Sequence, residues 1–208
     1  MGKYLNWGGN GLEDKIVNIL KEIPKVEQGK KVVLGIDGLI RSGKTTFVRY
    51  IEQYIQEKNI SVCIFHIDDY IVERKRRYNT GDDEWYEYYH LQWDIEGLKE
   101  NLFNRLKKTN ELNLLTYDYS SDKQKLQTVK IPDTCLIIIE GVFLQRKEWR
   151  HFYDFMVYLD CSREKRFNRE SDVTQSNIEK FEKRYWKAED HYMRRVSPLE
   201  RADLVIQN

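Results

Sequence analysis

The sequence has 208 residues, of which 33% are charged and 40% are apolar, with a formal net charge of +1. This length suits one globular domain, residues 1–208, with a sizeable core. The balance of 35 basic and 34 acidic residues gives no general reason to expect nucleic acid or an acidic membrane as a partner. We find no apolar run long enough to span a membrane and no signal-peptide core, so we expect a cytoplasmic protein.

Three cysteines, Cys63, Cys135 and Cys161, each lie in or beside an apolar run. Their number is odd and no C-x-x-C pair is present, so the pattern favours neither a disulfide framework nor a zinc or redox site. We expect free thiols in a reducing compartment.

The first 30 residues predict a lead-in followed by a helix. Residues 1–10 contain two adjacent glycines and predict a loose segment. Apolar residues then recur at helical spacing from Leu12 to Ile23, and Pro24 ends the pattern.

An apolar run at residues 32–36 predicts a strand that leads into a glycine-bounded loop and a helix. Residues 38–45 match G-x-x-x-x-G-K-[ST], the phosphate-binding P-loop. Glycines let several backbone N–H groups point inward, and the N-terminus of the next helix favours an anion. Lys44 is expected to reach the outer phosphates and the Thr45 hydroxyl to bind Mg²⁺. The residues expected to hold the nucleotide are Gly38, Arg41, Ser42, Gly43, Lys44, Thr45 and Thr46.

A second apolar run, residues 60–67, follows a helix predicted to end near Asn59 and completes a βαβ unit. Asp68 and Asp69 come directly after it. Because functional groups gather beyond the carboxyl ends of parallel strands, we expect this carboxylate pair at the same edge as the P-loop. The alternative is that the two aspartates cap the next segment.

Residues 71–93 combine a basic run with five aromatic side chains between Trp85 and Trp93. Basic residues beside aromatic ones can bind single-stranded nucleic acid, but the interleaved acidic residues argue against that partner. We expect a segment that covers the substrate, with some of its rings in the core. A solvated face is the alternative for the charge run.

Asp94 predicts the N-cap of a helix. Residues 112–119 and 125–131 flank a polar turn and predict a β-hairpin arm, residues 112–131. The continuous apolar run 135–139 predicts a central strand buried on both faces. Glu140 ends this strand, where its carboxylate is well placed to help Thr45 hold Mg²⁺ or its waters.

Residues 155–159 predict another strand, followed by a basic helix in which Arg166 and Arg169 share one face. A solvated helix is the alternative for this face. Ser176 and Glu179 match a capping box, which predicts the start of a further helix.

The segment 160–195 is expected to form a lid and the helix after it, and residues 202–206 predict the last strand. These elements predict an α/β protein with the three-layer fold of P-loop NTPases: a central parallel sheet of about five strands, helices on both faces and a small hairpin arm.

From about Lys31 to the C-terminus the sequence resembles the uridine kinase branch of the P-loop kinases, which also includes nicotinamide riboside, pantothenate and phosphoribulose kinases. The motifs that carry the resemblance are residues 38–46, Asp68-Asp69-Tyr70, Tyr117-Asp118-Tyr119, Ile139-Glu140-Gly141, Asp160 with Arg166 and Arg169, and residues 202–206.

The resemblance implies transfer of a phosphoryl group from ATP, with Mg²⁺, to a hydroxyl of a small molecule. It implies that Asp68 rather than Asp69 is the catalytic base and that Tyr117 lies against a nucleobase. It also implies that Arg166 and Arg169 grip phosphates. The residues expected to be catalytic are Asp68, Lys44, Arg166 and Arg169.

Two departures from the family pattern concern the acceptor. Asp122 and Gln124 stand where the uridine-binding arm has a His and an Arg. Tyr88 stands where a ribose-binding Asp is expected, and Glu87 is the nearest carboxylate that could replace it. A nucleoside is the leading acceptor, expected to contact Asp68, Tyr117 and Glu87.

Another small alcohol, or a nucleotide-binding regulatory protein without efficient transfer, is the alternative. The choice of ATP or GTP stays open, as does a homo-oligomer.

Overall fold

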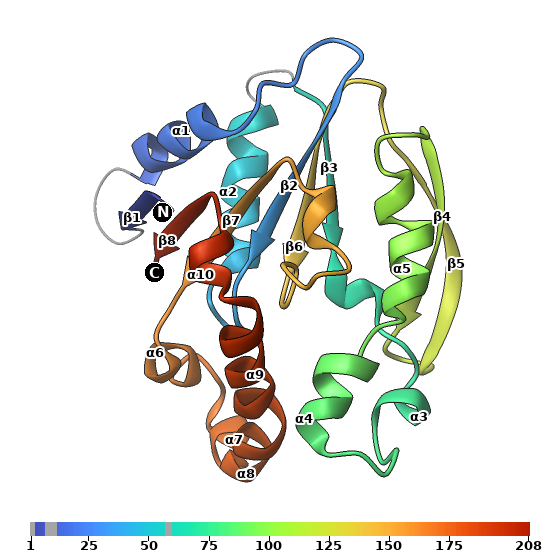
Figure 1. Cartoon of the computed structure of the whole chain (residues 1–208), viewed down its shortest axis with the longest axis vertical. Helices are drawn as coiled ribbons and strands as arrows, with labels where there is room; N and C mark the ends of the chain where they lie inside the picture. The colour runs from blue at the N-terminus through green and yellow to red at the C-terminus, as the bar shows by residue number, and fades with distance from the viewer. Residues whose placement is uncertain (1–2, 7–11, 57–59) are drawn as a thin grey trace.

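Six parallel strands form the central sheet, in the order β1-β8-β7-β2-β6-β3 (Figure 1). The structure is a computed structural model that describes residues 3–6, 12–56 and 60–208. The strands are β1 (Lys3–Asn6), β2 (Lys31–Asp37), β3 (Val62–His66), β6 (Cys135–Gly141), β7 (Phe155–Asp160) and β8 (Leu204–Gln207).

Strand β2 lies in the middle of the sheet, where Gly35 pairs with Ile139 of β6 on one side and with Met156 of β7 on the other. Every residue of β6 is buried, as expected for a parallel strand covered on both faces. On the far side of β6, Glu140 pairs with His66 of β3. The carboxyl ends of β2, β6 and β3 therefore lie side by side.

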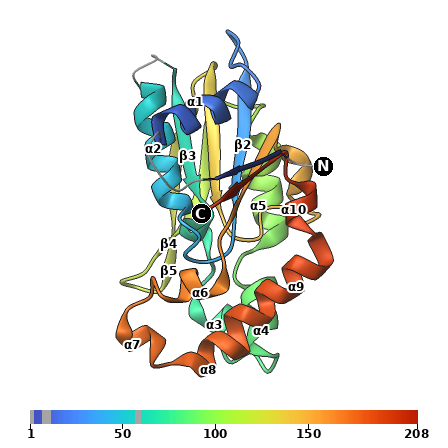
Figure 2. The ribbon, with the colours of Figure 1, turned by 90° about the vertical axis from the view of Figure 1, so that its left-hand side faces the viewer.

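Helices cover both faces of the sheet (Figure 2). On one face α1 (Leu12–Glu22) and α2 (Lys44–Gln56) pack over one apolar core; on the other α5 (Ile95–Asn101), α9 (Lys187–Val196) and α10 (Pro198–Arg201) are found. The shorter helices are α3 (Arg74–Arg77), α4 (Glu84–Tyr86), α6 (Arg163–Phe167), α7 (Asp172–Gln175) and α8 (Ile178–Lys180). None of the helices in the described part of the chain is long and apolar enough to cross a bilayer.

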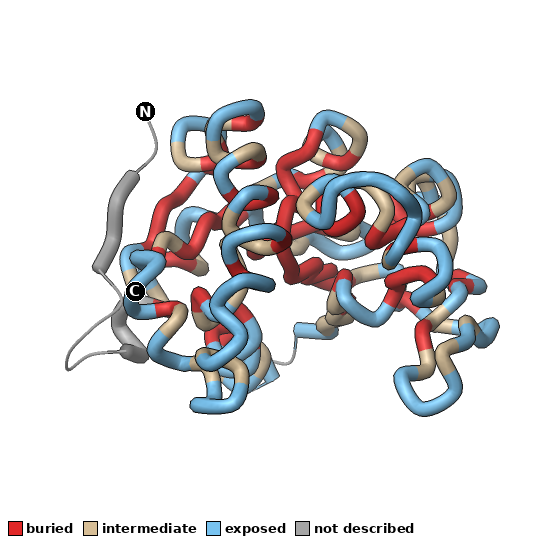
Figure 3. The backbone as a smooth tube through the Cα atoms, turned by 90° about the horizontal axis from the view of Figure 1, so that it is seen from below, coloured by how far each residue is buried: buried red, intermediate tan, exposed pale blue. Residues whose placement is uncertain are grey.

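Two cores flank the sheet because successive side chains of a strand point to opposite faces. Along β2, Val32 and Leu34 enter the core under α1 and α2, whereas Val33 enters the core on the other side. Figure 3 shows the buried backbone gathered in the interior and the exposed backbone around it.

The hairpin of β4 (Glu111–Asp118) and β5 (Lys123–Lys130) is a separate antiparallel pair beside the β3 edge of the sheet (Figure 1). Leu112 and Leu114 of β4 are buried in the same core as Leu98 of α5. These contacts attach the arm to the body of the protein.

The predicted parallel sheet with helices on both faces and a hairpin arm is confirmed. It has six strands instead of about five, because β1 pairs with β8 within the segment predicted to be loose. A four-residue edge strand carries too little periodicity to be recognised. The rest of residues 1–10, and the helix end near Asn59, lie outside the described residues.

Three further predictions concern the N-cap at Asp94, the capping box at Ser176 and the cysteines. Asp94 is the N-cap of α5 as predicted, and its side chain accepts a hydrogen bond of 3.0 Å from the Gly97 amide. The capping box does not form: Ser176 instead closes α7, where its hydroxyl donates to the Asp172 carbonyl. The three cysteines are free thiols, two of them buried and Cys63 half-buried.

Candidate active site

The P-loop connects the end of β2 to α2, which begins at Lys44. The Lys44 side chain folds back over the loop, and its ammonium donates a hydrogen bond of 3.0 Å to the Leu39 carbonyl. Burial lowers the pKa of Lys44, although the nearby carboxylates of Glu140 and Asp68 partly oppose this effect. A buried cation beside a loop of backbone N–H groups is suited to binding a polyphosphate.

Glu140 lies between the P-loop and β3. Its Oε1 accepts a hydrogen bond of 3.0 Å from the Thr45 hydroxyl and lies 2.7 Å from Nδ1 of His66. Burial alone would raise the pKa of Glu140, but the His66 hydrogen bond and the Lys44 charge hold it below its usual value. The same hydrogen bond raises the pKa of His66. Glu140 is therefore held as a carboxylate.

This donor set fits a magnesium ion that shares its coordination with a substrate. Mg²⁺ is commonly held by one or two carboxylates together with substrate phosphates and water. Thr45 and Glu140 supply one hydroxyl and one carboxylate at the P-loop. No cluster of three His, Cys, Asp or Glu side chains within the described ranges could hold a metal alone.

Asp68 lies just after β3, in the short helical turn Ile67–Tyr70. Its side chain opens into the cleft that Lys44 and Glu140 also line. Protein surrounds it on the other sides, and this desolvation raises the pKa of Asp68; the Glu140 carboxylate adds to the effect and Lys44 opposes it. The carboxylate predicted from the sequence therefore lies at the same edge of the sheet as the P-loop.

The cleft has a volume of about 1140 Å³, which exceeds the usual size of a single small-molecule pocket. The P-loop, Arg169 and Asn208 line one part of it. Residues from the segment 71–92, from the hairpin and from the lid line much of the rest. On that side the aromatic and polar lining residues include Arg77, Tyr88, Gln92, Tyr119 and Tyr185. Such a cleft has room for a nucleotide and a second substrate.

The sequence matches the phosphoribulokinase / uridine kinase family over residues 33–208. The chain belongs to this family. A uridine kinase of Borrelia duttonii is 30% identical over 186 residues, which cover 84% of this chain and 85% of that protein. A solved structure from Bacillus stearothermophilus, described as a "possible uridine kinase", is 50% identical, with a TM-score of 0.82 over 94% of this chain and 98% of that one.

D-glycerate 3-kinase from Cryptococcus neoformans is 11% identical and has a TM-score of 0.58 over 96% of each chain, so it shares the fold alone. Membership of the family confirms the resemblance stated above. The protein is a P-loop kinase, and one of its substrates is a nucleotide.

Most of the residues predicted for this kinase site line the cleft: Arg41, Gly43, Lys44, Thr45, Thr46, Asp68, Glu140 and Arg169. Gly38 and Ser42 lie at the base of the loop instead. A Cβ atom on Gly38 would lie 2.6 Å from the Ser42 hydroxyl oxygen and 2.8 Å from the Leu159 carbonyl oxygen. A glycine is therefore required there by close packing.

Glu87 does not line the cleft, contrary to the expectation that it contacts the acceptor. Its carboxylate is buried and accepts hydrogen bonds from the Thr80 amide (2.8 Å), the Thr80 hydroxyl (3.0 Å) and Arg184 (3.0 Å). Its neighbour Tyr88 lines the cleft instead. Adjacent residues of a helical segment face different directions, and here Tyr88 faces the cleft while Glu87 faces Arg184.

Tyr117 is likewise displaced from its expected place. Its ring is buried, and its hydroxyl donates to Asp122 across 2.7 Å and accepts from Arg77 across 3.3 Å. Tyr119, two residues closer to the hairpin tip, lines the cleft and donates to the Asp68 carbonyl across 3.3 Å. Tyr117 therefore supports Tyr119 from behind, with 4.8 Å between the ring centres.

The two hairpin residues that depart from the family pattern have structural partners. Asp122 accepts a hydrogen bond of 2.9 Å from the Arg74 amide, and Gln124 donates to the Ile71 carbonyl across 3.1 Å. These bonds fasten the hairpin to the start of the segment 71–93. Neither side chain is among the residues that line the cleft.

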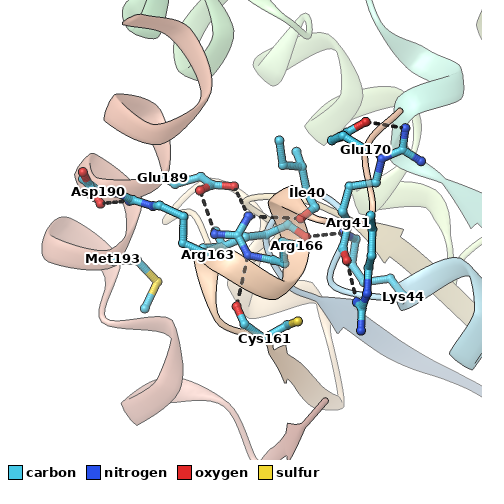
Figure 4. Close-up of polar contacts among 12 residues, drawn as sticks. Ile40, Arg41, Lys44, Cys161, Arg163, Arg166, Glu170, Glu189, Asp190 and Met193 are labelled. Carbon is cyan, nitrogen blue, oxygen red and sulfur yellow. Dashed lines mark hydrogen bonds and ion pairs between the residues drawn. The ribbon is translucent and has the colours of Figure 1, made fainter. Parts of the chain in front are cut away.

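The two lid arginines contact the P-loop backbone, and Figure 4 shows the contact of Arg166 with Ile40. Arg169 donates to the Arg41 carbonyl across 2.7 Å and also lines the cleft. Arg166 is buried, outside the cleft lining, and pairs with Glu189 through both carboxylate oxygens (2.7 and 2.9 Å). The other hydrogen bonds of Arg166 go to backbone carbonyls. Arg166 is therefore not placed to bind a phosphate directly, contrary to what the resemblance implied.

Sequence reasoning missed several residues around the site. Asp37, fully buried before Gly38, accepts hydrogen bonds from the Gly38 amide, the Tyr192 hydroxyl and Gln145. Burial raises its pKa, although these donors oppose the effect. An aspartate inside an apolar run was a readable signal. Nothing in the local sequence pointed to Glu189, because its partner Arg166 is 23 residues away.

Proposed function

We propose that this protein transfers the terminal phosphoryl group of ATP, with Mg²⁺, to a hydroxyl of a small acceptor, and that a nucleoside is the favoured acceptor. One observation carries the proposal: Lys44, Thr45, Glu140 and Asp68 meet in one cleft. Phosphoryl transfer depends on positioning and charge stabilisation, and these four side chains supply both.

Asp68 is proposed as the general base. The acceptor oxygen forms a bond to the phosphorus as the bond from phosphorus to the ADP oxygen breaks, and the hydroxyl proton passes to the Asp68 carboxylate. The pKa of Asp68 is raised toward neutral pH, and a general base is more effective when its pKa lies near the working pH.

Lys44 and Arg169 are proposed to stabilise charge on the phosphates, since both line the nucleotide side of the cleft. Thr45 and Glu140 would hold Mg²⁺, which neutralises phosphate charge when it is bound. The backbone N–H groups of the P-loop would bind and orient the phosphate chain.

The proposed nucleoside acceptor rests on the relatives named as uridine kinases and on the lining of the cleft. Tyr88, Tyr119 and Tyr185 present aromatic surface against which a planar base can pack. Gln92 is 9% exposed, and its Oε1 has no hydrogen-bond partner among the described residues. An acceptor hydroxyl or N–H group would satisfy it.

A second acceptor class is favoured by Arg77. This guanidinium is 5% exposed, lines the cleft and forms no ion pair with a carboxylate in the described part of the chain. Buried cations are normally paired. An acceptor that carries a carboxylate or phosphate beside its hydroxyl would supply the missing charge.

The test is ADP release from purified protein with ATP and Mg²⁺ across a panel of acceptors. The panel contains nucleosides, neutral small alcohols, hydroxy acids and sugar phosphates, and each product is identified by its mass. Turnover stimulated by a nucleoside supports the favoured acceptor, and turnover with an anionic alcohol supports the second class.

No stimulation by any acceptor, with ATP binding intact, would overturn transfer and favour a nucleotide-binding regulatory protein. Lys44→Ala is the control, since it should remove both nucleotide binding and any true turnover.

A further inference from the structure

Four consecutive carbonyl groups of the P-loop, from Leu39 to Ser42, are each held by a side-chain donor. The donors lie on three parts of the chain: the P-loop lysine, the lid and the residue after β8. In order, they are Lys44 to the Leu39 carbonyl (3.0 Å), Arg166 to Ile40 (3.0 Å), Arg169 to Arg41 (2.7 Å) and Asn208 to Ser42 (2.5 Å).

Holding these carbonyls sets the direction of the N–H groups. A peptide unit is planar and trans, so its C=O and the N–H of the next residue point to opposite sides. Fixing the Ile40, Arg41 and Ser42 carbonyls therefore also fixes the N–H groups of the residues that follow them. Successive N–H groups fixed toward one point form the concavity that binds an anion.

The Ile40 carbonyl is held by one buried ion pair, Arg166 with Glu189 (Figure 4). The Ile40 carbonyl accepts a hydrogen bond of 3.0 Å from Arg166, and the same guanidinium donates to both carboxylate oxygens of Glu189. The two partners are 3% and 1% exposed, and they come from α6 and α9. Glu189 of α9 is therefore connected to the middle of the P-loop through Arg166.

Asn208 makes a second attachment at the other end of the loop, and its Oδ1 also accepts a hydrogen bond of 3.4 Å from Arg169. Its backbone N–H donates to the Asp160 carbonyl across 2.8 Å, which places its side chain against the P-loop. A Cβ atom on Gly43 would lie only 2.5 Å from the Asn208 amide nitrogen. The absence of a side chain at Gly43 thus lets Asn208 approach the Ser42 carbonyl.

We propose that Glu189 and Asn208 are positioning residues for nucleotide binding, which hold the P-loop carbonyls outward and keep its N–H groups arranged for phosphate. The inference rests on the proposed function, since it assumes that the cleft binds a nucleotide. A preorganised site does not have to be ordered when the ligand arrives, so losing the attachment should weaken binding of the nucleotide. Acceptor binding should change little, because neither residue belongs to that side.

The first test is Asn208→Ala, with Gln207→Ala as the matched control. Gln207 is the exposed neighbour, so both variants remove an amide side chain from adjacent positions. We expect the dissociation constant of a fluorescent ATP analogue to rise about tenfold for Asn208→Ala, as for the loss of one good hydrogen bond. Gln207→Ala should stay within twofold, and the KM of the acceptor should be unchanged in both.

The second test is Glu189→Gln, which keeps the shape of the side chain but removes its charge. We expect weaker binding of the ATP analogue and a higher KM for ATP, with the acceptor KM unchanged, at a temperature where circular dichroism shows the variant folded. A lower melting temperature with unchanged ATP binding would show a purely structural role and overturn the proposal for Glu189. If this variant does not fold, the Asn208 comparison decides.

The wild-type protein separates the two levels of inference. If it binds no ATP analogue, the proposed function fails. If it binds the analogue and Asn208→Ala and Glu189→Gln both bind it equally well, only the positioning role is overturned.

Discussion

The Thr45 hydroxyl donates a hydrogen bond of 3.0 Å to Glu140 and so joins the first turn of α2 to the end of β6. The pair brings together one hydroxyl and one carboxylate, which are ligand types that Mg²⁺ prefers. Both groups line the cleft with Lys44.

Thr45→Val should lower kcat by about ten- to a hundredfold and raise the Mg²⁺ concentration needed for half-maximal activity. Valine has nearly the shape of threonine but no hydroxyl, so the change removes one oxygen from the proposed Mg²⁺ site. Thr45→Ser retains the hydroxyl and serves as the control. Mg²⁺ titrations of both variants that coincide with wild type would contradict a metal role for Thr45.

Asp68→Asn should lower kcat by about a hundredfold or more, because the acceptor hydroxyl loses its proton acceptor. ATP binding should remain, since the amide keeps the size of the side chain. Asp69→Asn is the matched control, because Asp69 is adjacent but does not line the cleft. A larger loss for Asp69→Asn than for Asp68→Asn would move the base to Asp69.

The pH profile of kcat/KM gives a second readout for Asp68. Desolvation by the surrounding protein raises the pKa of this cleft-facing carboxyl above 3.8, and only the deprotonated form can accept a proton. Activity should therefore fall as the pH falls through this raised pKa. If the residual activity of Asp68→Asn falls at low pH in the same way as the wild-type activity, the group that titrates is not Asp68.

His66 should make stability depend on pH. Because Glu140 holds the folded-state pKa of His66 above 6.5, this group stabilises the fold fully below pH 6.5, and the contribution is lost as the pH rises through the raised pKa. The His66 side chain is 40% exposed, so we expect less than about 1 kcal/mol. Urea unfolding of wild type and His66→Asn should show a gap that narrows with rising pH; a constant gap would contradict the linkage.

Glu87→Gln should lower the free energy of unfolding by about 3 kcal/mol, because it leaves the Arg184 guanidinium buried without its counter-charge. The two side chains are 3% and 1% exposed. Glu179→Gln is the control, since it breaks the exposed pair with Lys183 and should change stability little. Urea unfolding measures both. Equal, small effects would show that the Glu87 pair is not structurally important.

Gln92→Leu should raise the KM of the acceptor about tenfold and leave the KM of ATP unchanged. The reason is that the Gln92 side chain lines the cleft and that its buried oxygen has no hydrogen-bond partner among the described residues. Gln127→Leu, on the exposed face of β5, is the control. An unchanged acceptor KM would remove Gln92 from the acceptor site.

The chemistry of the nucleotide side was readable from local sequence. A strand, a glycine-bounded loop and a helix must be contiguous to form a P-loop, so Lys44 and Thr45 could be assigned from one short segment. Asp68 and Glu140 could be assigned because each directly follows a buried strand, and the ends of parallel strands share one edge. The order and register of β2, β6 and β3 then bring these residues together.

The acceptor side was not readable in this way. Tyr88 and Glu87 are adjacent, and their directions depend on how the helical segment packs against Arg184, which lies 97 residues further along. Tyr117 and Tyr119 are two residues apart, so the alternation of a predicted strand would place them on one face and does not tell which of them reaches the cleft. In the structure β4 ends at Asp118, and Tyr119 lies in the turn that follows. The docking of the hairpin decides it, through Asp122 and Gln124.

The sequence by itself therefore determined the nucleotide-binding chemistry, the parallel sheet and the carboxylates at its edge, because these depend on short contiguous patterns. Only the tertiary structure decided that Arg166 holds the loop and that Glu189 and Asn208 hold it with Arg166. Those contacts join segments 23 to 166 residues apart, and no local pattern specifies which of several charged side chains will meet. Packing of the lid against the P-loop makes that choice.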